Sequence, residues 1–238
     1  METIKRVCLI AENEFNLKLS DQQIEQLQVY ERCLVSWNEK FNLTAITDHD
    51  GVWFKHFLDC MSLVPHLTRK DACLIDVGTG AGFPGLLLKI VLPALKITLL
   101  DATLKKITFL NHVISELGLI DIKAICGRSE DVAHDSSYRE QFDYCTTRAV
   151  SSFGICLEIC VGLLKKHGEL LLIRGPKGVD EMKSSGAKLK CFSLKEVLSS
   201  KFTNPYNDMI SNVLVLNKVD CTNKNYPRSY ARIVNANK

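Results

Sequence analysis

The chain has 238 residues, of which 46% are hydrophobic and 24% are charged, as in a soluble globular protein with one large α/β domain and an appendage, or with two small domains. No apolar run reaches the roughly 18 residues that a membrane span requires, and the first fifteen residues lack the unbroken apolar segment of a secretory signal. The ten cysteines are scattered without any C-x-x-C pair, which argues against a metal site or a disulfide framework and indicates reduced thiols in a cytoplasmic protein.

The charge is unevenly distributed along the chain. Residues 1–160 contain 16 basic and 21 acidic residues, whereas residues 161–238 contain 14 basic and 6 acidic ones. A basic C-terminal third is compatible with a polyanionic partner such as nucleic acid, because phosphate contacts supply most of the non-specific affinity. Charge alone leaves open the alternative of a solvated, lysine-rich surface without a partner.

Helical patterns cover residues 1–67. Ser20 followed by Gln23 forms a capping box, and apolar residues then recur on one face of a predicted helix that runs to about residue 40. A second helix is predicted from Val52 to Val64, ending at Pro65. We therefore expect a helical N-terminal extension over residues 1–67, followed by an α/β domain over residues 68–238.

From residue 73 onward, short apolar runs alternate with helical patterns, which is typical of a parallel sheet covered on both faces. These runs predict strands at residues 73–77, 96–101, 122–126, 142–147, 169–174, 191–197 and 212–219. The last two strands are too close for a crossover helix, so we expect them to pair antiparallel at one edge. A Rossmann-like sheet of seven strands with the last one reversed is similar to that of class I methyltransferases, which use S-adenosylmethionine.

The stretch LIDVGTGAGFPG, residues 74–85, predicts the ligand site, because ligands of doubly wound sheets lie outside the carboxyl ends of the strands. Gly78 supplies the turn, and Gly80 and Gly82 let the backbone approach a ligand without a Cβ. Asp101 ends the second predicted strand and is placed to accept hydrogen bonds from ribose hydroxyls. Glu130 follows the third strand, where an acidic residue usually meets the adenine amino group.

Two cofactors fit this pattern. Gly80, Gly82 and Gly85 satisfy the G-x-G-x-x-G pattern of a nicotinamide-dependent oxidoreductase. However, Asp76 would repel a pyrophosphate but favour a sulfonium and an amino group. Pro84 removes an N–H from the helix terminus that a diphosphate would use, and the chain lacks a separate substrate domain. We therefore favour S-adenosylmethionine and keep an NAD-dependent oxidoreductase as the alternative.

The acceptor atom is inferred from the segment after the fourth predicted strand. This segment, TTRAV at residues 146–150, contains neither the Asn/Asp-Pro-Pro-aromatic element of amino-group methylation nor a cysteine nucleophile, and Cys145 is interpreted as a core residue. A ring nitrogen such as guanine N7 needs neither device, because its lone pair carries no proton and requires only alignment with the methyl group. No side chain is assigned as a general base.

Six segments occur in order along the chain: FNLTAI (41–46), KHFLDC (55–60), DVGTGAGFPG (76–85), LLDATLKKITFL (99–110), GRSED (127–131) and TRAV (147–150). Together they resemble the GidB/RsmG family, bacterial methyltransferases that modify guanine N7 in 16S ribosomal RNA of the small subunit. The resemblance implies that the donor site is lined by Gly78, Phe83, Asp101, Ala102, Thr103, Ser129 and Glu130. It also places Arg148 at this site, as the candidate catalytic residue.

Candidate RNA-binding residues lie on both sides of the sheet region. They are Asn42, Thr44 and His56, which the resemblance places beside the active site, and the basic residues Arg174, Lys177, Arg228 and Arg232. In the alternative interpretation, Asn42 and Thr44 are only turn and cap residues, and His56 and Asp59 only form a hydrogen bond with each other. The expected partner is 16S rRNA or the small ribosomal subunit, bound by a monomer without membrane or metal. A non-catalytic RNA-binding protein is a third interpretation.

Overall fold

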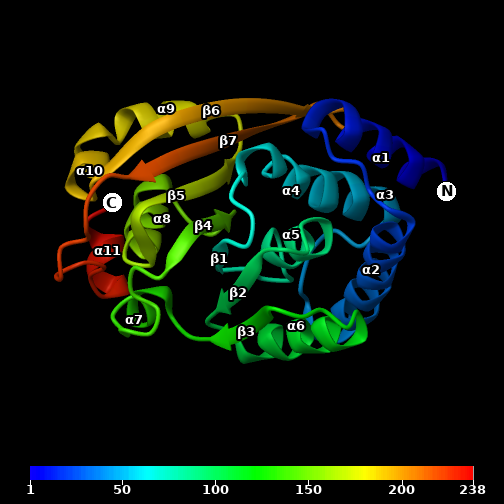
Figure 1. The fold of residues 1–238 in the computed structure, drawn as a ribbon, viewed down its shortest axis with the longest axis horizontal. Helices are drawn as coiled ribbons and strands as arrows, with labels where there is room; N and C mark the ends of the chain where they lie inside the picture. The colour runs from blue at the N-terminus through cyan, green and yellow to red at the C-terminus, as the bar shows by residue number, and fades with distance from the viewer. Residues whose placement is uncertain (238) are drawn as a thin grey trace.

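The computed structural model describes residues 1–237 and contains a seven-stranded sheet in the order β3-β2-β1-β4-β5-β7-β6 (Figure 1). Its strands are β1 (Cys73–Val77), β2 (Lys96–Asp101), β3 (Ile122–Cys126), β4 (Phe142–Arg148), β5 (Leu164–Arg174), β6 (Leu194–Asn204) and β7 (Met209–Lys218). Strands β1 to β5 pair in parallel, and β7 lies antiparallel between β5 and β6. The predicted Rossmann-like architecture with a reversed last strand is confirmed.

The central strands β1, β2, β4, β5 and β7 are mostly buried because helices cover both faces of the sheet. Successive residues alternate between two cores: Leu171 belongs to one hydrophobic cluster and Leu172 to the other. The first cluster contains side chains of α5 (Gly85–Val91) and α6 (Leu104–Glu116). The second contains side chains of α8 (Phe153–Val161), α9 (Gly178–Ser184) and α11 (Tyr230–Asn235). Near-continuous apolar strands are what such a two-sided sheet requires.

Of the N-terminal helices, α2 (Asp21–Phe41) lies outside α5 and α6, whereas α1 (Glu2–Phe15) packs on the helical segment around residues 52–58 (Figure 1). The predicted capping box is present, since Ser20 Oγ accepts from the Gln23 N–H and the Gln23 side chain accepts from the Ser20 N–H. Leu27 and Leu34 of α2 belong to the same hydrophobic cluster as Leu86 of α5. The extension therefore packs on the sheet domain through a shared core, and the boundary after residue 67 stays a prediction.

The helix predicted from Val52 to Val64 is wrong in its limits. The helical segment begins with α3 (His49–Gly51), continues through the π-helical η1 (Val52–Leu58), and ends with α4 (Asp59–Met61). Pro65 lies inside a separate 3-10 turn, η2 (Val64–His66). Within η1, the Phe54 and Lys55 carbonyls each accept a 2.6 Å hydrogen bond, from Asn204 Nδ2 and Arg148 Nη2 respectively. Long-range bonding thus accompanies the local widening of the helix.

The strand predicted at residues 191–197 is also wrong in position. Cys191, where the predicted strand begins, is the last residue of the short helix α10 (Gly186–Cys191). Strand β6 begins only at Leu194 and runs to Asn204. β6 is an edge strand whose side chains are mostly exposed, so its apolar pattern is weak. Its limits are determined by pairing with β7, from Leu194 opposite Lys218 to Asn204 opposite Met209.

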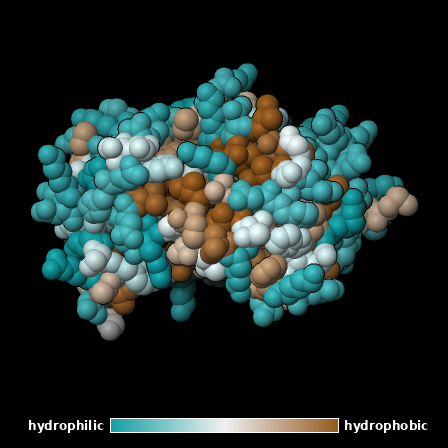
Figure 2. Space-filling view, turned by 90° about the horizontal axis from the view of Figure 1, so that it is seen from below, coloured by the Kyte–Doolittle hydropathy of each residue, from teal (hydrophilic) through white to brown (hydrophobic). Residues whose placement is uncertain are grey.

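Figure 2 views the molecule from below Figure 1 and shows hydrophilic residues around the margin of this face, with hydrophobic residues gathered in its middle. Among residues 1–237, no helix is both long enough and apolar enough to cross a membrane.

Candidate active site

A cavity of about 620 Å³ lies at the carboxyl ends of the parallel strands, where doubly wound sheets bind their ligands. Nine of the residues predicted to bind the cofactor line it: Gly78, Gly80, Phe83, Asp101, Ala102, Thr103, Ser129, Glu130 and Arg148. Two of the predicted RNA-binding residues, Thr44 and His56, line it as well. Its volume falls within the range typical of small-molecule sites.

The loop after β1 forms one wall of the cavity. Its first two N–H groups, of Gly78 and Thr79, donate to the Leu100 carbonyl over 2.8 and 3.1 Å, which fixes the loop to the end of β2. Gly80 has φ +60°, and a Cβ placed there would meet no heavy atom nearer than the Gly78 oxygen at 3.9 Å. The space above Gly80 is therefore open, and a ligand can approach its backbone directly.

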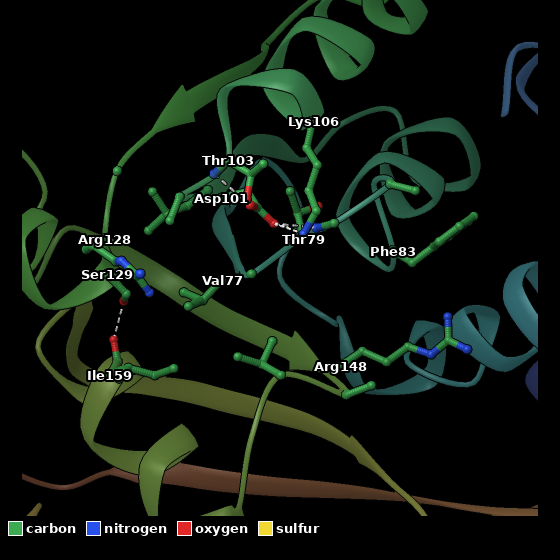
Figure 3. Close-up of a pocket in the computed structure, with 18 of the residues that line it drawn as sticks. Val77, Thr79, Phe83, Asp101, Thr103, Lys106, Arg128, Ser129, Arg148 and Ile159 are labelled. Atoms are coloured by element: carbon green, nitrogen blue, oxygen red, sulfur yellow. Dashed lines mark hydrogen bonds and ion pairs between the residues drawn. The ribbon is translucent and has the colours of Figure 1, made fainter. Parts of the chain in front are cut away.

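Asp101 joins the ends of two strands. Its Oδ2 accepts from the Gly80 N–H at 3.0 Å and from Lys106 Nζ at 3.1 Å, and its Oδ1 accepts from the Thr103 N–H at 2.9 Å (Figure 3). Since each carboxylate oxygen has two acceptor sites, Oδ1 retains one for a ligand hydroxyl. The carboxylate is thus oriented by its own loop before any ligand binds. Lys106 is a site residue that sequence reasoning missed, although its spacing of five residues from Asp101 is visible in the sequence.

Two residues predicted to bind the cofactor do not line the cavity. Asp76 is fully buried, and its Oδ2 accepts from the Gly85 N–H over 2.8 Å at the start of α5. It therefore occupies the helix terminus at which a dinucleotide would place its pyrophosphate. Gly82 faces α2 instead, because a Cβ at this position would lie 2.6 Å from the Tyr30 hydroxyl. Tyr30 Oη donates to the Ala81 carbonyl over 2.5 Å and was missed at the sequence level.

The environment of Asp76 changes its acidity. Complete burial raises the pKa of this carboxyl to about 7, although the hydrogen bond from the Gly85 N–H acts in the opposite direction. An ionised Asp76 is therefore costly in the folded protein, and part of the population is protonated near neutral pH.

The opposite end of the cavity is formed by α7 (Ser129–Val132), α8 and the C-terminal segment. Ser129 Oγ donates to the Ile159 carbonyl over 2.5 Å (Figure 3), and Glu130 lies beside it, 8% exposed. Tyr230, at the start of α11, also lines the cavity, and the Arg128 guanidinium lies 5.4 Å from the centre of its ring. Tyr230 was missed at the sequence level because no local pattern links it to residue 128.

Arg148 connects β4 to the N-terminal helical segment. Its Nε lies 2.9 Å from Asp59 Oδ2, and its Nη1 lies 3.3 Å from His56 Nδ1. In Figure 3 the guanidinium points away from Asp101 and toward that segment. Asp59 in turn accepts a hydrogen bond from Ser211 Oγ. Arg148 is thus held by groups of the protein, and Asp59 bonds to Arg148 rather than to His56.

His56 lies between Arg148 and Thr44. Its ring stacks on Phe83 with centroids 4.5 Å apart, and its Nε2 is 2.9 Å from Thr44 Oγ1. Burial, followed by the charge of Arg148, lowers the pKa of His56 to about 3. The imidazole is therefore neutral at physiological pH.

The remaining predicted RNA-binding residues lie outside the cavity wall. Asn42 caps the C-terminus of α2 with φ 48° and is exposed, as the turn alternative expected. Arg174 pairs with Glu181 at 2.7 Å, and Arg228 pairs with the buried Glu158 at 2.6 Å. Among residues 1–237, Lys177 and Arg232 are exposed and make no ion pair. The same residues contain no cluster of three or more His, Cys, Asp or Glu side chains suited to a metal ion.

The strand order and the site at the strand ends define a class I methyltransferase fold. Solved structures agree: a ribosomal protein L11 methylase from Lactobacillus delbrueckii subsp. bulgaricus has TM-score 0.52 at 13% identity, covering 70% of this chain and 79% of its own. The 16S rRNA (adenine(1408)-N(1))-methyltransferase from Catenulisporales acidiphilia has TM-score 0.53 at 12% identity, covering 67% and 88%. At these identities the likeness concerns the fold.

The family follows from the sequence itself. The family model GidB, described as rRNA small subunit methyltransferase G, matches residues 23–209. Proteins named Ribosomal RNA small subunit methyltransferase G are 39% identical in Alkaliphilus metalliredigens, over 90% of both chains, and 41% identical in Thermoanaerobacter sp., over 94% of this chain and 92% of theirs. The chain belongs to this family of methyltransferases. The predicted resemblance is confirmed, and the oxidoreductase alternative has no support.

Proposed function

We propose that this chain transfers the methyl group of S-adenosylmethionine to N7 of a guanine in 16S ribosomal RNA. The observation that supports this proposal most is the cavity at the ends of β1 and β2, in which the open backbone of Gly80 faces the carboxylate of Asp101. In a member of this family, such a cavity is the place for a methyl donor.

The chemistry requires alignment rather than proton transfer. When bound, S-adenosylmethionine supplies a methyl group: the in-plane lone pair of N7 forms the new N–C bond while the S–C bond breaks and its electron pair stays on the sulfur. N7 carries no proton, so no general base is needed at that atom. The protein has to align the base with the donor and to exclude water, and the neutral His56, with its pKa lowered to about 3, agrees with a site that takes up no proton.

The residues of the cavity suit the parts of the donor. Asp101 binds the ribose hydroxyls through the free acceptor site of Oδ1, and the loop at Gly78 and Gly80 binds the methionine part through its backbone. Glu130 binds the adenine amino group next to the ring of Tyr230. Asp76 and Gly82 support binding indirectly, because their contacts with Gly85 and Tyr30 determine the shape of the loop.

A matched pair of glycine substitutions tests this assignment. Gly80 and Gly118 have φ +60° and +58°; a Cβ at Gly80 would meet its nearest heavy atom at 3.9 Å, and one at Gly118 would meet none within 4 Å. Gly80→Ala and Gly118→Ala should therefore each destabilise the fold by about 1 kcal/mol. Only Gly80→Ala should weaken binding of S-adenosylmethionine, by roughly tenfold or about 1.4 kcal/mol in calorimetry. Equal affinities for the two variants would contradict the assignment.

The reaction is tested on ribosomes from cells with and without the gene. N7-methylguanine is detected by borohydride reduction, aniline cleavage and primer extension, and a cleavage site should disappear in cells that lack the gene. An unchanged pattern refutes the proposal. Equilibrium dialysis against S-adenosylmethionine and NAD provides an independent test, because binding of NAD alone would favour the oxidoreductase. Retained ribosome binding without any methyl transfer would favour the non-catalytic interpretation.

The RNA interface uses the exposed basic residues of the C-terminal third. Lys177 and Arg232 contact phosphates, whereas Arg174 and Arg228 keep their partners Glu181 and Glu158 and support the surface. The enzyme acts as a cytoplasmic monomer on the small subunit or its rRNA, and light scattering at micromolar concentration tests that state.

A further inference from the structure

Thr44 has a hydroxyl group with two neighbours that approach its oxygen. The Ile46 N–H donates to Thr44 Oγ1 over 3.1 Å, and His56 Nε2 lies 2.9 Å from the same oxygen. A hydroxyl oxygen has two acceptor sites and one proton to donate. The direction of the hydroxyl proton therefore depends on which nitrogen of His56 carries the ring proton.

Arg148 determines that tautomer. Two of its nitrogens, Nη1 and Nη2, lie 3.3 and 3.4 Å from His56 Nδ1. A guanidinium group only donates, so a protonated Nδ1 would point its N–H at the N–H groups of Arg148, with no acceptor between them. Nδ1 is therefore the acceptor, the single ring proton is on Nε2, and Nε2–H donates to Thr44. Burial keeps the ring neutral, since the pKa of His56 is lowered to about 3.

The surrounding groups keep this arrangement fixed. Arg148 is anchored by Asp59 at 2.9 Å and by the Lys55 carbonyl at 2.6 Å. The His56 ring is stacked on Phe83 and is 8% exposed, so a ring flip would disrupt the stack and both of its polar contacts. A chain of groups from Asp59 to Thr44 thus sets the direction of one hydroxyl proton.

Both acceptor sites of Thr44 Oγ1 are occupied by Ile46 and His56, so its own O–H is left to donate into the cavity that Thr44 lines. We infer that this hydroxyl donates to O6 of the target guanine and thereby selects guanine over adenine; the inference rests on the proposed N7 methylation. Next to N7, guanine carries the acceptor O6, whereas adenine carries the donor N6 amino group. An adenine in the same position would place its N6 amino donor against the donor hydroxyl of Thr44.

The bond acts on recognition rather than on the chemical step. Methylation of N7 places a positive charge on the base, which makes O6 a weaker acceptor as the reaction proceeds. The hydrogen bond is therefore not strengthened in the transition state, so its main contribution is to binding of the substrate. Its loss should mainly raise KM and leave kcat nearly unchanged, which separates a recognition role from a general loss of structure.

The test combines variants of Thr44 with removal of O6 from the substrate. The methylated guanosine is first mapped, and small subunits are then reconstituted with 2-aminopurine, which keeps N7 but lacks O6, at that position. The wild-type protein should prefer guanine in kcat/KM by roughly tenfold more than a protein without the hydroxyl does, the factor of one neutral hydrogen bond. Thr44→Val should therefore show a preference roughly tenfold smaller than the wild type, and Thr44→Ser should keep the wild-type preference. Thr47→Val, an exposed residue of the same loop, is the matched control and should also retain it.

The ratio of kcat/KM for the guanine and the 2-aminopurine substrate is measured on each protein. The fraction of folded protein cancels in this ratio, so a partly unfolded variant does not alter the result. An unchanged preference in Thr44→Val overturns the inference while leaving the proposed function intact. A long-range ¹H–¹⁵N spectrum that shows His56 protonated at Nδ1 overturns it as well. A wild-type protein that methylates neither substrate refutes the proposed function, and the inference with it.

Discussion

Replacement of Arg148 by methionine should destabilise the protein strongly, because the guanidinium compensates a buried carboxylate. The Asp59 side chain is only 3% exposed, and Arg148 Nε is 2.9 Å from its Oδ2. Methionine keeps the length and the apolar surface of the arginine stem but removes every donor. Asp59 would keep the hydrogen bond from Ser211, and the Lys55 carbonyl would lose its side-chain donor.

The size of the effect follows from the burial of the pair. Removal of one partner of a buried ion pair costs about 3–5 kcal/mol, because the other charge is left without compensation. That is a large part of the roughly 5–15 kcal/mol that stabilises a typical domain. If Asp59→Asn is added to Arg148→Met, the uncompensated charge disappears. The double variant should therefore be more stable than Arg148→Met alone, with a coupling free energy of about 2 kcal/mol.

The assay is urea unfolding followed by circular dichroism for the wild type, both single variants and the double variant. Lys166→Ala is the control, since Lys166 and Asp220 form a pair whose side chains are 48% and 67% exposed; its loss should not change the midpoint. Additive effects, or a cost below about 1 kcal/mol for Arg148→Met, would refute the interpretation that Arg148 compensates the buried charge of Asp59. Unchanged stability with complete loss of methyl transfer would instead indicate a direct contact with substrate.

Three further predictions concern the cofactor, pH and RNA. Tyr230→Ala should raise the Kd for S-adenosylmethionine by roughly 5- to 30-fold, as expected for loss of an aromatic face against a base, whereas Tyr206→Ala, which lies outside the cavity wall, should bind like the wild type in calorimetry. Because the pKa of Asp76 is raised to about 7 in the fold, the wild-type protein should lose stability as the pH rises from about 4 to 7. Between pH 4 and 8, the free energy of unfolding of Asp76→Asn should therefore rise by up to ~4 kcal/mol relative to that of the wild type. The same pH dependence of unfolding in both proteins would contradict this. Lys177→Ala and Arg232→Ala should each reduce the slope of log K for rRNA binding against log salt by about 1, and unchanged slopes would remove these residues from the interface.

The sequence by itself determined the sheet and the wall of the cavity nearest to it. Strands β1, β2 and β3 lie at the predicted residues, because buried parallel strands are continuous apolar runs bounded by turn residues, a signal that is local in the chain. The glycine loop follows β1 directly and Asp101 is the last residue of β2, so their meeting at one edge was predictable from the topology rule alone.

Only the tertiary structure decided what the polar side chains do. Arg148 bonds to residues about 90 positions away, Arg228 pairs with Glu158, and Tyr230 reaches the cavity from the end of the chain. No sequence period reports such contacts, since they join layers of the fold that are distant along the chain. Burial then changes what these groups can do: a solvent-exposed histidine near Arg148 would titrate close to its usual pKa, whereas His56 between Phe83 and Arg148 stays neutral.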